Sequence, residues 1–167
     1  MKICMIGTGY VGLVSGTCFA DIGNQVYCVD KDVSKINKLN SGFSTIFEPG
    51  LDELIQKNYK ANRLFFTTDL KKAVTVSDII FICVGTPNVK GSLKVNLSFV
   101  YKCTKEILAI AKKKKIIVTK STVPVGTGDV IEKILKKKKK LFSVISNPEF
   151  LREGEAIRDF KYPDRIV

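Results

Sequence analysis

The chain contains no histidine, and this absence removes the commonest general base of enzymes. A histidine-based catalytic triad and a histidine metal site are therefore excluded. The five cysteines include no pair with C-x-x-C spacing, so we predict no metal site. Three of them, Cys4, Cys28 and Cys83, lie in apolar runs, which favours buried and reduced thiols over reactive ones.

Long apolar runs are also absent from the sequence. None reaches the roughly 18–20 residues that a membrane-spanning helix needs. The apolar stretch near the N-terminus ends at Gly7, which makes it too short for the core of a signal peptide. We therefore expect a cytoplasmic protein with no membrane partner. The 167 residues, 45% apolar and 26% charged, are typical of a globular domain with a substantial core.

Acidic residues are scarce beside basic ones, 16 against 28, which gives a net charge of +12. Much of the excess lies in two lysine runs, residues 112–115 and 136–140. Each run follows an amphipathic stretch, so its lysines are expected near helix C-termini, where cations complement the helix dipole. Neither run carries stacking aromatics or a known motif, so we expect a solvated face and no nucleic-acid partner. The competing hypothesis, a basic nucleic-acid-binding protein, predicts binding that weakens steeply with salt.

Short apolar runs alternate with stretches of helical periodicity along the whole chain. The predicted strands are residues 2–6, 25–29, 64–67, 78–84, 116–119 and 142–145. The predicted helices are residues 11–22, 34–39, 51–58, 69–74, 98–111 and 128–135. This alternation predicts an α/β fold: a doubly wound, Rossmann-like parallel sheet of about six strands with helices on both faces. We place this domain at residues 1–147 and interpret residues 148–167 as the start of a further, truncated element.

The first predicted strand runs directly into the sequence G-T-G-Y-V-G, which fits the pattern G-x-G-x-x-G. Between a strand and a helix, this pattern binds the pyrophosphate of a dinucleotide on backbone N–H groups. Gly7 permits the tight turn, Gly9 lets the pyrophosphate approach, and Gly12 lets the helix pack closely. Asp30 ends the second predicted strand, where a carboxylate accepts hydrogen bonds from the adenosine ribose and repels a 2′-phosphate. We therefore predict NAD, rather than NADP, as the cofactor.

Two further predicted strands end in small polar residues and prolines. The sequences are V-G-T-P at residues 84–87 and S-T-V-P-V-G at residues 121–126. Ligands of doubly wound sheets lie at the carboxyl ends of the strands, so both segments are expected beside the cofactor. Ordinary strand-to-helix turns use the same residue types and remain an alternative for each segment.

These segments, together with K-S-T-V-P-V-G-T at residues 120–127 and N-P-E-F-L-R-E-G at residues 147–154, give the chain a family resemblance. Over essentially its whole length, it resembles the N-terminal part of the UDP-glucose/GDP-mannose dehydrogenase family, and most of all the members that act on UDP-glucose. The resemblance implies oxidation of UDP-glucose to UDP-glucuronate by two NAD, through an aldehyde held as a thiohemiacetal on a cysteine. Oxidation of GDP-mannose or a UDP-N-acetyl sugar, and a stand-alone NAD-binding or regulatory module, remain open.

The resemblance also implies roles for individual residues. The implied NAD contacts are Gly7, Gly9, Tyr10, Val11, Gly12, Asp30, Lys35, Thr86, Thr122 and Glu153. The implied substrate contacts are Glu149, Phe150, Leu151, Arg152 and Glu153. The implied catalytic residues, which would position or activate the water that resolves the thioester, are Thr122, Glu149 and Glu153. A carboxylate suits this general-base role when burial raises its pKa.

The chain departs from the family in one large respect. The family's catalytic cysteine lies in a glycine-rich motif beyond residue 167, and none of the five cysteines here has that context. The residues that hold the uridine diphosphate and form the dimer lie beyond this point as well. We therefore expect these 167 residues alone to bind NAD without oxidising UDP-glucose. A homodimer of a longer form is left open.

Overall fold

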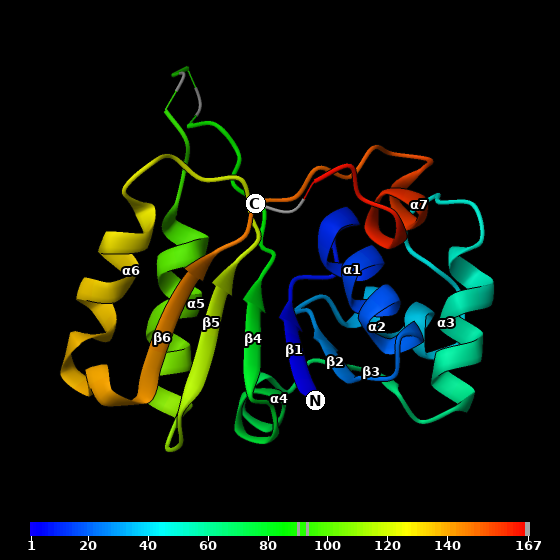
Figure 1. Cartoon of the computed structure of the whole chain (residues 1–167), viewed down its shortest axis with the longest axis horizontal. Helices are drawn as coiled ribbons and strands as arrows, with labels where there is room; N and C mark the ends of the chain where they lie inside the picture. The colour runs from blue at the N-terminus through cyan, green and yellow to red at the C-terminus, as the bar shows by residue number, and fades with distance from the viewer. Residues whose placement is uncertain (90, 93, 166–167) are drawn as a thin grey trace.

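A computed structural model describes residues 1–89, 91–92 and 94–165. In this part of the chain, six parallel strands form one sheet in the order β3-β2-β1-β4-β5-β6. The strands are β1 (Lys2–Ile6), β2 (Gln25–Val29), β3 (Leu64–Thr67), β4 (Ile79–Ile82), β5 (Lys115–Thr119) and β6 (Phe142–Ser146). Figure 1 shows β4, β5 and β6 running upward side by side, so their carboxyl ends lie at the top. The predicted parallel sheet is confirmed.

Helices cover both faces of this sheet, as expected for a doubly wound fold (Figure 1). They are α1 (Tyr10–Asp21), α2 (Val33–Asn40), α3 (Leu51–Lys60), α4 (Leu70–Val76), α5 (Ser98–Ile110), α6 (Thr127–Leu135), the 3-10 helix η1 (Lys136–Leu141) and α7 (Ala156–Lys161). One apolar cluster joins Met5 of β1 to Leu13 and Ile55 on the α1, α2, α3 and α7 side. A second joins Ile80 of β4 to Ile107 on the α4, α5 and α6 side. The central strands are nearly continuous apolar runs because both of their faces are buried.

The segment after β6 folds back onto α1 (Figure 1). The ring of Phe160 in α7 meets that of Phe19 edge to face, with centroids 4.9 Å apart. Lys161 Nζ donates to Asp21 Oδ2 at 2.9 Å. The described part of the segment predicted at 148–167 therefore packs on the sheet domain, while residues 166–167 lie outside the described residues.

Lysines from the two runs bond to the ends of neighbouring helices. Lys115 is buried in β5 and donates to the carbonyl oxygens of Ser77 and, at 3.2 Å, of Thr75, where α4 ends. Lys138 donates to the carbonyl oxygens of Leu108 and Ala111, at 2.9 and 3.2 Å, where α5 ends. Each of these two lysines therefore lies near a helix C-terminus, but it is that of a neighbouring helix and not of the helix that its run follows. The burial of Lys115 contradicts the predicted solvated face at this position. Burial also lowers the pKa of Lys115. The hydrogen bonds to the carbonyl oxygens offset the free-energy cost of removing its ammonium group from water.

All five cysteines are free thiols, and Cys4, Cys28 and Cys83 are buried as predicted. Burial raises the pKa of Cys83 to about 12, so this thiol stays protonated and unreactive at neutral pH. Among the described residues, no cluster of three histidine, cysteine, aspartate or glutamate side chains could hold a metal ion. A separate finding is that no helix in the described part of the chain is long and apolar enough to cross a membrane.

Candidate functional site

The strand order reverses between β1 and β4, which lie side by side at the centre of the sheet. The chain leaves β1 toward β2 on one side and leaves β4 toward β5 on the other. In open α/β sheets, ligands bind beyond the carboxyl ends of the strands at such a reversal. The three segments predicted to contact the cofactor, residues 7–12, 84–87 and 121–126, follow β1, β4 and β5. The fold therefore brings all three to one edge of the sheet (Figure 1).

Two glycines of the first turn are required by the packing of the protein itself. Gly7 has a φ of +104°, and a Cβ there would lie 2.6 Å from the carbonyl oxygen of Cys83. A Cβ on Gly12 would lie 2.0 Å from the carbonyl oxygen of Gly7. Any larger side chain at either position forces the backbone of β1, α1 or β4 to move. The predicted roles of a tight turn and of close helix packing are consistent with this geometry.

Gly9 differs from both, because nothing lies within 4 Å of the position its Cβ would occupy. Its φ of −71° suits any residue, and it is the N-cap of α1 without a side-chain hydrogen bond. The first N–H groups of α1 therefore lack the side-chain acceptor that usually caps a helix. An exposed, uncapped helix start with open space beside it fits a pyrophosphate, whose oxygens would accept from these N–H groups.

Asp30 is fixed in orientation at the end of β2. Its Oδ2 accepts from the backbone N and the hydroxyl of Thr8, at 2.9 and 2.8 Å, and its Oδ1 accepts from Asp32 N at 3.1 Å. Burial tends to raise its pKa, but these hydrogen bonds and the charge of Lys35 outweigh burial and hold the pKa below its ordinary value. The result is an ionised, oriented carboxylate beside the glycine turn. Sequence reasoning missed Thr8, whose side chain is fully buried.

Hydrogen bonds tie together the ends of β4 and β5. Thr86 Oγ1 donates to the carbonyl oxygen of Thr122 at 2.9 Å. Ser121 Oγ donates to the carbonyl oxygens of Val84 and Ile82, at 2.7 and 3.2 Å. The two predicted strand ends therefore form one rigid unit, with Thr122 exposed at its surface.

A cavity of about 810 Å³ lies between α1 and the segment that follows β6. Glu149 lines it and accepts from Leu151 N at 2.7 Å. Lys120, buried at the end of β5, also lines it and donates to Asn147 Oδ1 at 3.3 Å. Burial lowers the pKa of Lys120, and sequence reasoning gave this lysine no role. The cavity is lined by Phe19, Lys120, Asn147, Pro148, Glu149, Phe150, Leu151, Arg152, Asp159, Phe160, Pro163, Asp164 and Arg165.

The predicted substrate residues fall into two groups. Four of them, Glu149 to Arg152 in the sequence, line the cavity, and the guanidinium of Arg152 pairs with Asp159 at 2.7 Å. Glu153 does not line it in the described part of the chain, and its side chain is exposed. The next residue, Gly154, donates its N–H to Tyr10 Oη and to Glu48 Oε2, each at 2.8 Å. The backbone next to Glu153 is therefore held at the side chains of Tyr10 and Glu48, and sequence reasoning missed the contribution of Glu48.

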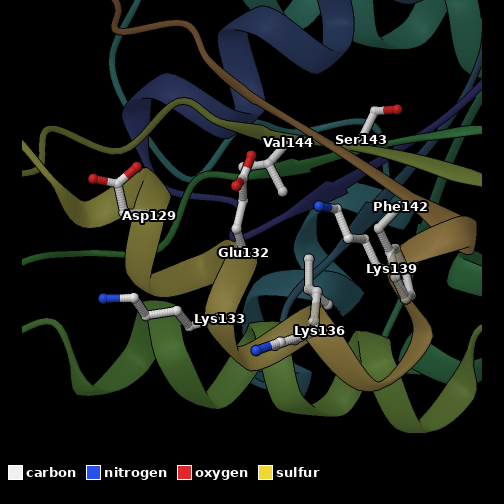
Figure 2. Close-up of a pocket in the computed structure, with 9 residues that line it drawn as sticks. Asp129, Glu132, Lys133, Lys136, Lys139, Phe142, Ser143 and Val144 are labelled. Carbon is white, nitrogen blue, oxygen red and sulfur yellow. The ribbon is translucent and has the colours of Figure 1, made fainter.

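A second hollow of about 470 Å³ lies beside α6, η1 and β6. Figure 2 shows its lining of acidic and basic side chains, with Asp129 and Glu132 from α6 and three lysines nearby. None of the residues predicted for cofactor or substrate belongs to this lining. The cavity beside α1 is therefore the better candidate for a substrate.

Comparisons with known proteins agree with this geometry. The model of the UDP-glucose/GDP-mannose dehydrogenase family, NAD binding domain, matches residues 1–167. The UDP-glucose 6-dehydrogenase of Rhizobium meliloti (strain 1021) is 57% identical over 169 residues, covering 100% of this chain and 39% of that protein. TuaD, a UDP-glucose 6-dehydrogenase of Bacillus subtilis (strain 168), is 52% identical, covering 99% of this chain and 36% of that protein. The chain thus spans under two fifths of the length of these relatives.

Solved structures give the same result. A GDP-mannose dehydrogenase from Pseudomonas aeruginosa, crystallised as a ternary complex, has a TM-score of 0.92 and 41% identity, covering 100% of this chain and 40% of that one. A UDP-glucose dehydrogenase from the archaeon Pyrobaculum islandicum also has a TM-score of 0.92, with 36% identity, covering 99% of this chain and 39% of that one.

Proposed function

Because the chain belongs to the UDP-glucose/GDP-mannose dehydrogenase family and matches its NAD-binding domain, we propose that its NAD site is the β1–α1 turn. The pyrophosphate lies against Gly9 and the first N–H groups of α1, and Tyr10 and Val11 flank it. Asp30 accepts hydrogen bonds from the adenosine ribose, with Lys35 nearby. Thr86, Thr122 and Glu153 complete the cofactor contacts, which are Gly7, Gly9, Tyr10, Val11, Gly12, Asp30, Lys35, Thr86, Thr122 and Glu153.

The observation that carries this proposal is the contrast within the glycine turn. Protein atoms fill the space around Gly7 and Gly12 but leave the space beside Gly9 open. A glycine that the fold itself does not need is explained by a ligand that must reach the backbone. Asp30 lies at the end of β2, the strand beside β1. Its oriented carboxylate is suited to accept hydrogen bonds from the adenosine ribose attached to that pyrophosphate.

We further propose that the activity is that of a UDP-glucose 6-dehydrogenase when this domain acts with the portion that relatives carry beyond it. The names of the relatives at 57% and 52% identity favour UDP-glucose over GDP-mannose. Residues 149–153 contact the sugar, and Thr122, Glu149 and Glu153 position or activate water. NAD, when bound, supplies the hydride acceptor. The domain limits at residue 147 and a homodimer of the longer form belong to the same proposal.

GDP-mannose is the second candidate substrate, since the GDP-mannose dehydrogenase structure matches this chain at 41% identity. Competing turnover of UDP-glucose and GDP-mannose by the longer protein separates the two. We expect UDP-glucose to give the higher kcat/KM, and a higher value for GDP-mannose would reverse the assignment.

Substituting Asp30 with alanine is expected to weaken NAD binding about 10–100-fold, because hydrogen bonds to a charged group contribute roughly 1.5–3 kcal/mol. Binding of NADP should weaken far less, since the repulsion of its 2′-phosphate disappears together with the carboxylate. Calorimetric titration with both dinucleotides measures the two effects. The control is Asp129→Ala, which removes an exposed carboxylate from the first turn of α6. Equal NAD affinity in wild type and Asp30→Ala would contradict the ribose contact.

The purified 167-residue chain is expected to bind NAD and to form no NADH from UDP-glucose. Burial raises the pKa of all five thiols, so none of them supplies the thiolate nucleophile that an aldehyde intermediate needs. The measurement follows NADH absorbance after UDP-glucose is added to the NAD-saturated chain. Sustained NADH production would show that these residues contain a complete active site.

A further inference from the structure

Three separate parts of the chain meet at the carboxylate of Glu48. Glu48 lies in the loop between α2 and α3 and is 7% exposed. Tyr10 Oη, at the start of α1, donates to Glu48 Oε2. From the segment that precedes and begins α7, Gly154 N donates to Oε2 at 2.8 Å and Ile157 N donates to Oε1 at 3.3 Å. Gly154 N also donates to Tyr10 Oη at 2.8 Å, which closes the network.

A buried carboxylate is tolerated only where donors replace its hydration, and here one hydroxyl and two backbone amides do so. Burial and the hydrogen bond to Glu48 raise the pKa of Tyr10 to about 12, so its phenol remains a donor at neutral pH. Glu48 also supplies an acceptor to the first turn of α7, whose own N-cap residue Glu155 makes no side-chain cap. These contacts fix the backbone on both sides of residue 155.

The ion pairs of Arg152, which precedes Gly154 by two residues, are weaker. Arg152 pairs with Asp159 and Glu155, but its side chain is 69% exposed. Ion pairs in that setting typically contribute about 0–1 kcal/mol. The hydrogen bonds to the buried Glu48 are therefore the main polar interaction that holds Gly154, and with it the neighbouring Glu153, at the start of α1.

We infer that Tyr10 and Glu48 are a pair of positioning residues that holds Glu153 against the dinucleotide turn, so that cofactor binding and the ordering of residues 152–157 reinforce each other. Tyr10 directly follows Gly9, the residue with open space beside it for the pyrophosphate. A ligand that orders this turn therefore also orders the tyrosine hydroxyl. By linkage, an ordered segment must then strengthen cofactor binding by the same factor. The inference rests on the proposed function, because Glu153 takes its role from the proposed cofactor contact.

The test measures amide hydrogen exchange by NMR and NAD affinity by calorimetry in the wild type, Tyr10→Phe and Glu48→Gln. NAD should increase the protection of the Gly154 and Ile157 amides in the wild type. Tyr10→Phe should lower that protection and the NAD affinity about fivefold, the equivalent of one ordinary hydrogen bond. Glu48→Gln should lower both about tenfold or more, because its bonds are charge-assisted.

The matched controls are Tyr59→Phe and Glu53→Gln, which change exposed side chains of α3 and should alter neither quantity. Amides of the sheet core, such as that of Ile80, should keep their protection in all variants, which separates a local effect from general destabilisation. If Glu48→Gln fails to fold, Tyr10→Phe alone decides the outcome.

Unchanged protection of Gly154 and Ile157 in folded variants without NAD would overturn the positioning role. Reduced protection with unchanged NAD affinity would overturn the coupling. A wild-type chain that binds no NAD would instead refute the proposed function, while its exchange pattern would still report on the Tyr10–Glu48 contacts.

Discussion

Replacing Gly12 with alanine is expected to destabilise the folded chain by about 3 kcal/mol or more, the upper range for forcing extra atoms into a packed interior. The added Cβ would lie 2.0 Å from the carbonyl oxygen of Gly7 and 3.0 Å from Cys83 Cβ. Backbone atoms of a tight turn cannot yield as the end of a flexible side chain can, so either α1 or the turn must move. For a chain of this size, the midpoint of thermal unfolding should fall by about 6–12 °C.

Circular dichroism during heating measures this change, and Gly128→Ala is the matched control. Gly128 also lies in a helix, α6, but nothing lies within 4 Å of its Cβ position. Alanine there should raise stability by up to about 1 kcal/mol through helix propensity. If Gly12→Ala unfolded at the wild-type temperature, the close packing of α1 on the turn would be wrong.

Replacing Gly9 with valine is expected to abolish NAD binding and to leave the stability of the fold nearly unchanged. The open space around Gly9 accommodates a side chain, and its φ of −71° causes no strain. The valine side chain would occupy the position proposed for the pyrophosphate. It would thereby block the hydrogen bonds from the first N–H groups of α1 to the pyrophosphate. Losing two such charge-assisted bonds, at roughly 1.5–3 kcal/mol each, weakens binding by about 100-fold or more.

Calorimetric titration with NAD, alongside thermal unfolding of the same sample, tests this prediction. The unfolding midpoint should stay within a few degrees of the wild type, since only an exposed N-cap position changes. NAD binding by Gly9→Val at wild-type affinity would mean that the pyrophosphate lies elsewhere. Gly9 and Gly12 thus separate what the ligand requires from what the fold requires.

Local sequence was sufficient to predict the sheet and most helices. Hydrophobic runs locate the strands, and the structure shifts predicted boundaries by only a few residues. One example is α4, which begins after Asp69, whose carboxylate caps it by accepting from Lys72 N. The sequence indicated that the strands are parallel but did not give their order in the sheet. That order depends on contacts between segments that are distant in the sequence.

The helix α7 was not predicted because its six residues are too few for a clear hydrophobic period. Its stability comes from tertiary contacts, with Phe160 against Phe19 and Ile157 N on Glu48. Lys115 illustrates the reverse case. It belongs to a lysine run typical of solvated surface, yet carbonyl oxygens at the end of α4 allow it to be buried.

The site residues that lie within one sequence motif were predictable. Those that come together from distant parts of the chain were not. The glycine turn and Asp30 follow from strand–turn–helix spacing. Tyr10 and Glu48 are 38 residues apart, and Gly154 is 144 residues from Tyr10, so no local pattern predicts that they meet. Residues of this kind are found from the structure because a buried carboxylate must have donors.

Following backbone amide resonances during an NAD titration shows directly whether NAD binds at the β1–α1 turn. We expect saturable shifts that are largest at residues 9–12 and near Asp30, and small shifts at residues 136–140. Shifts centred on that lysine run, or no saturable change at residues 9–12, would contradict binding at this turn.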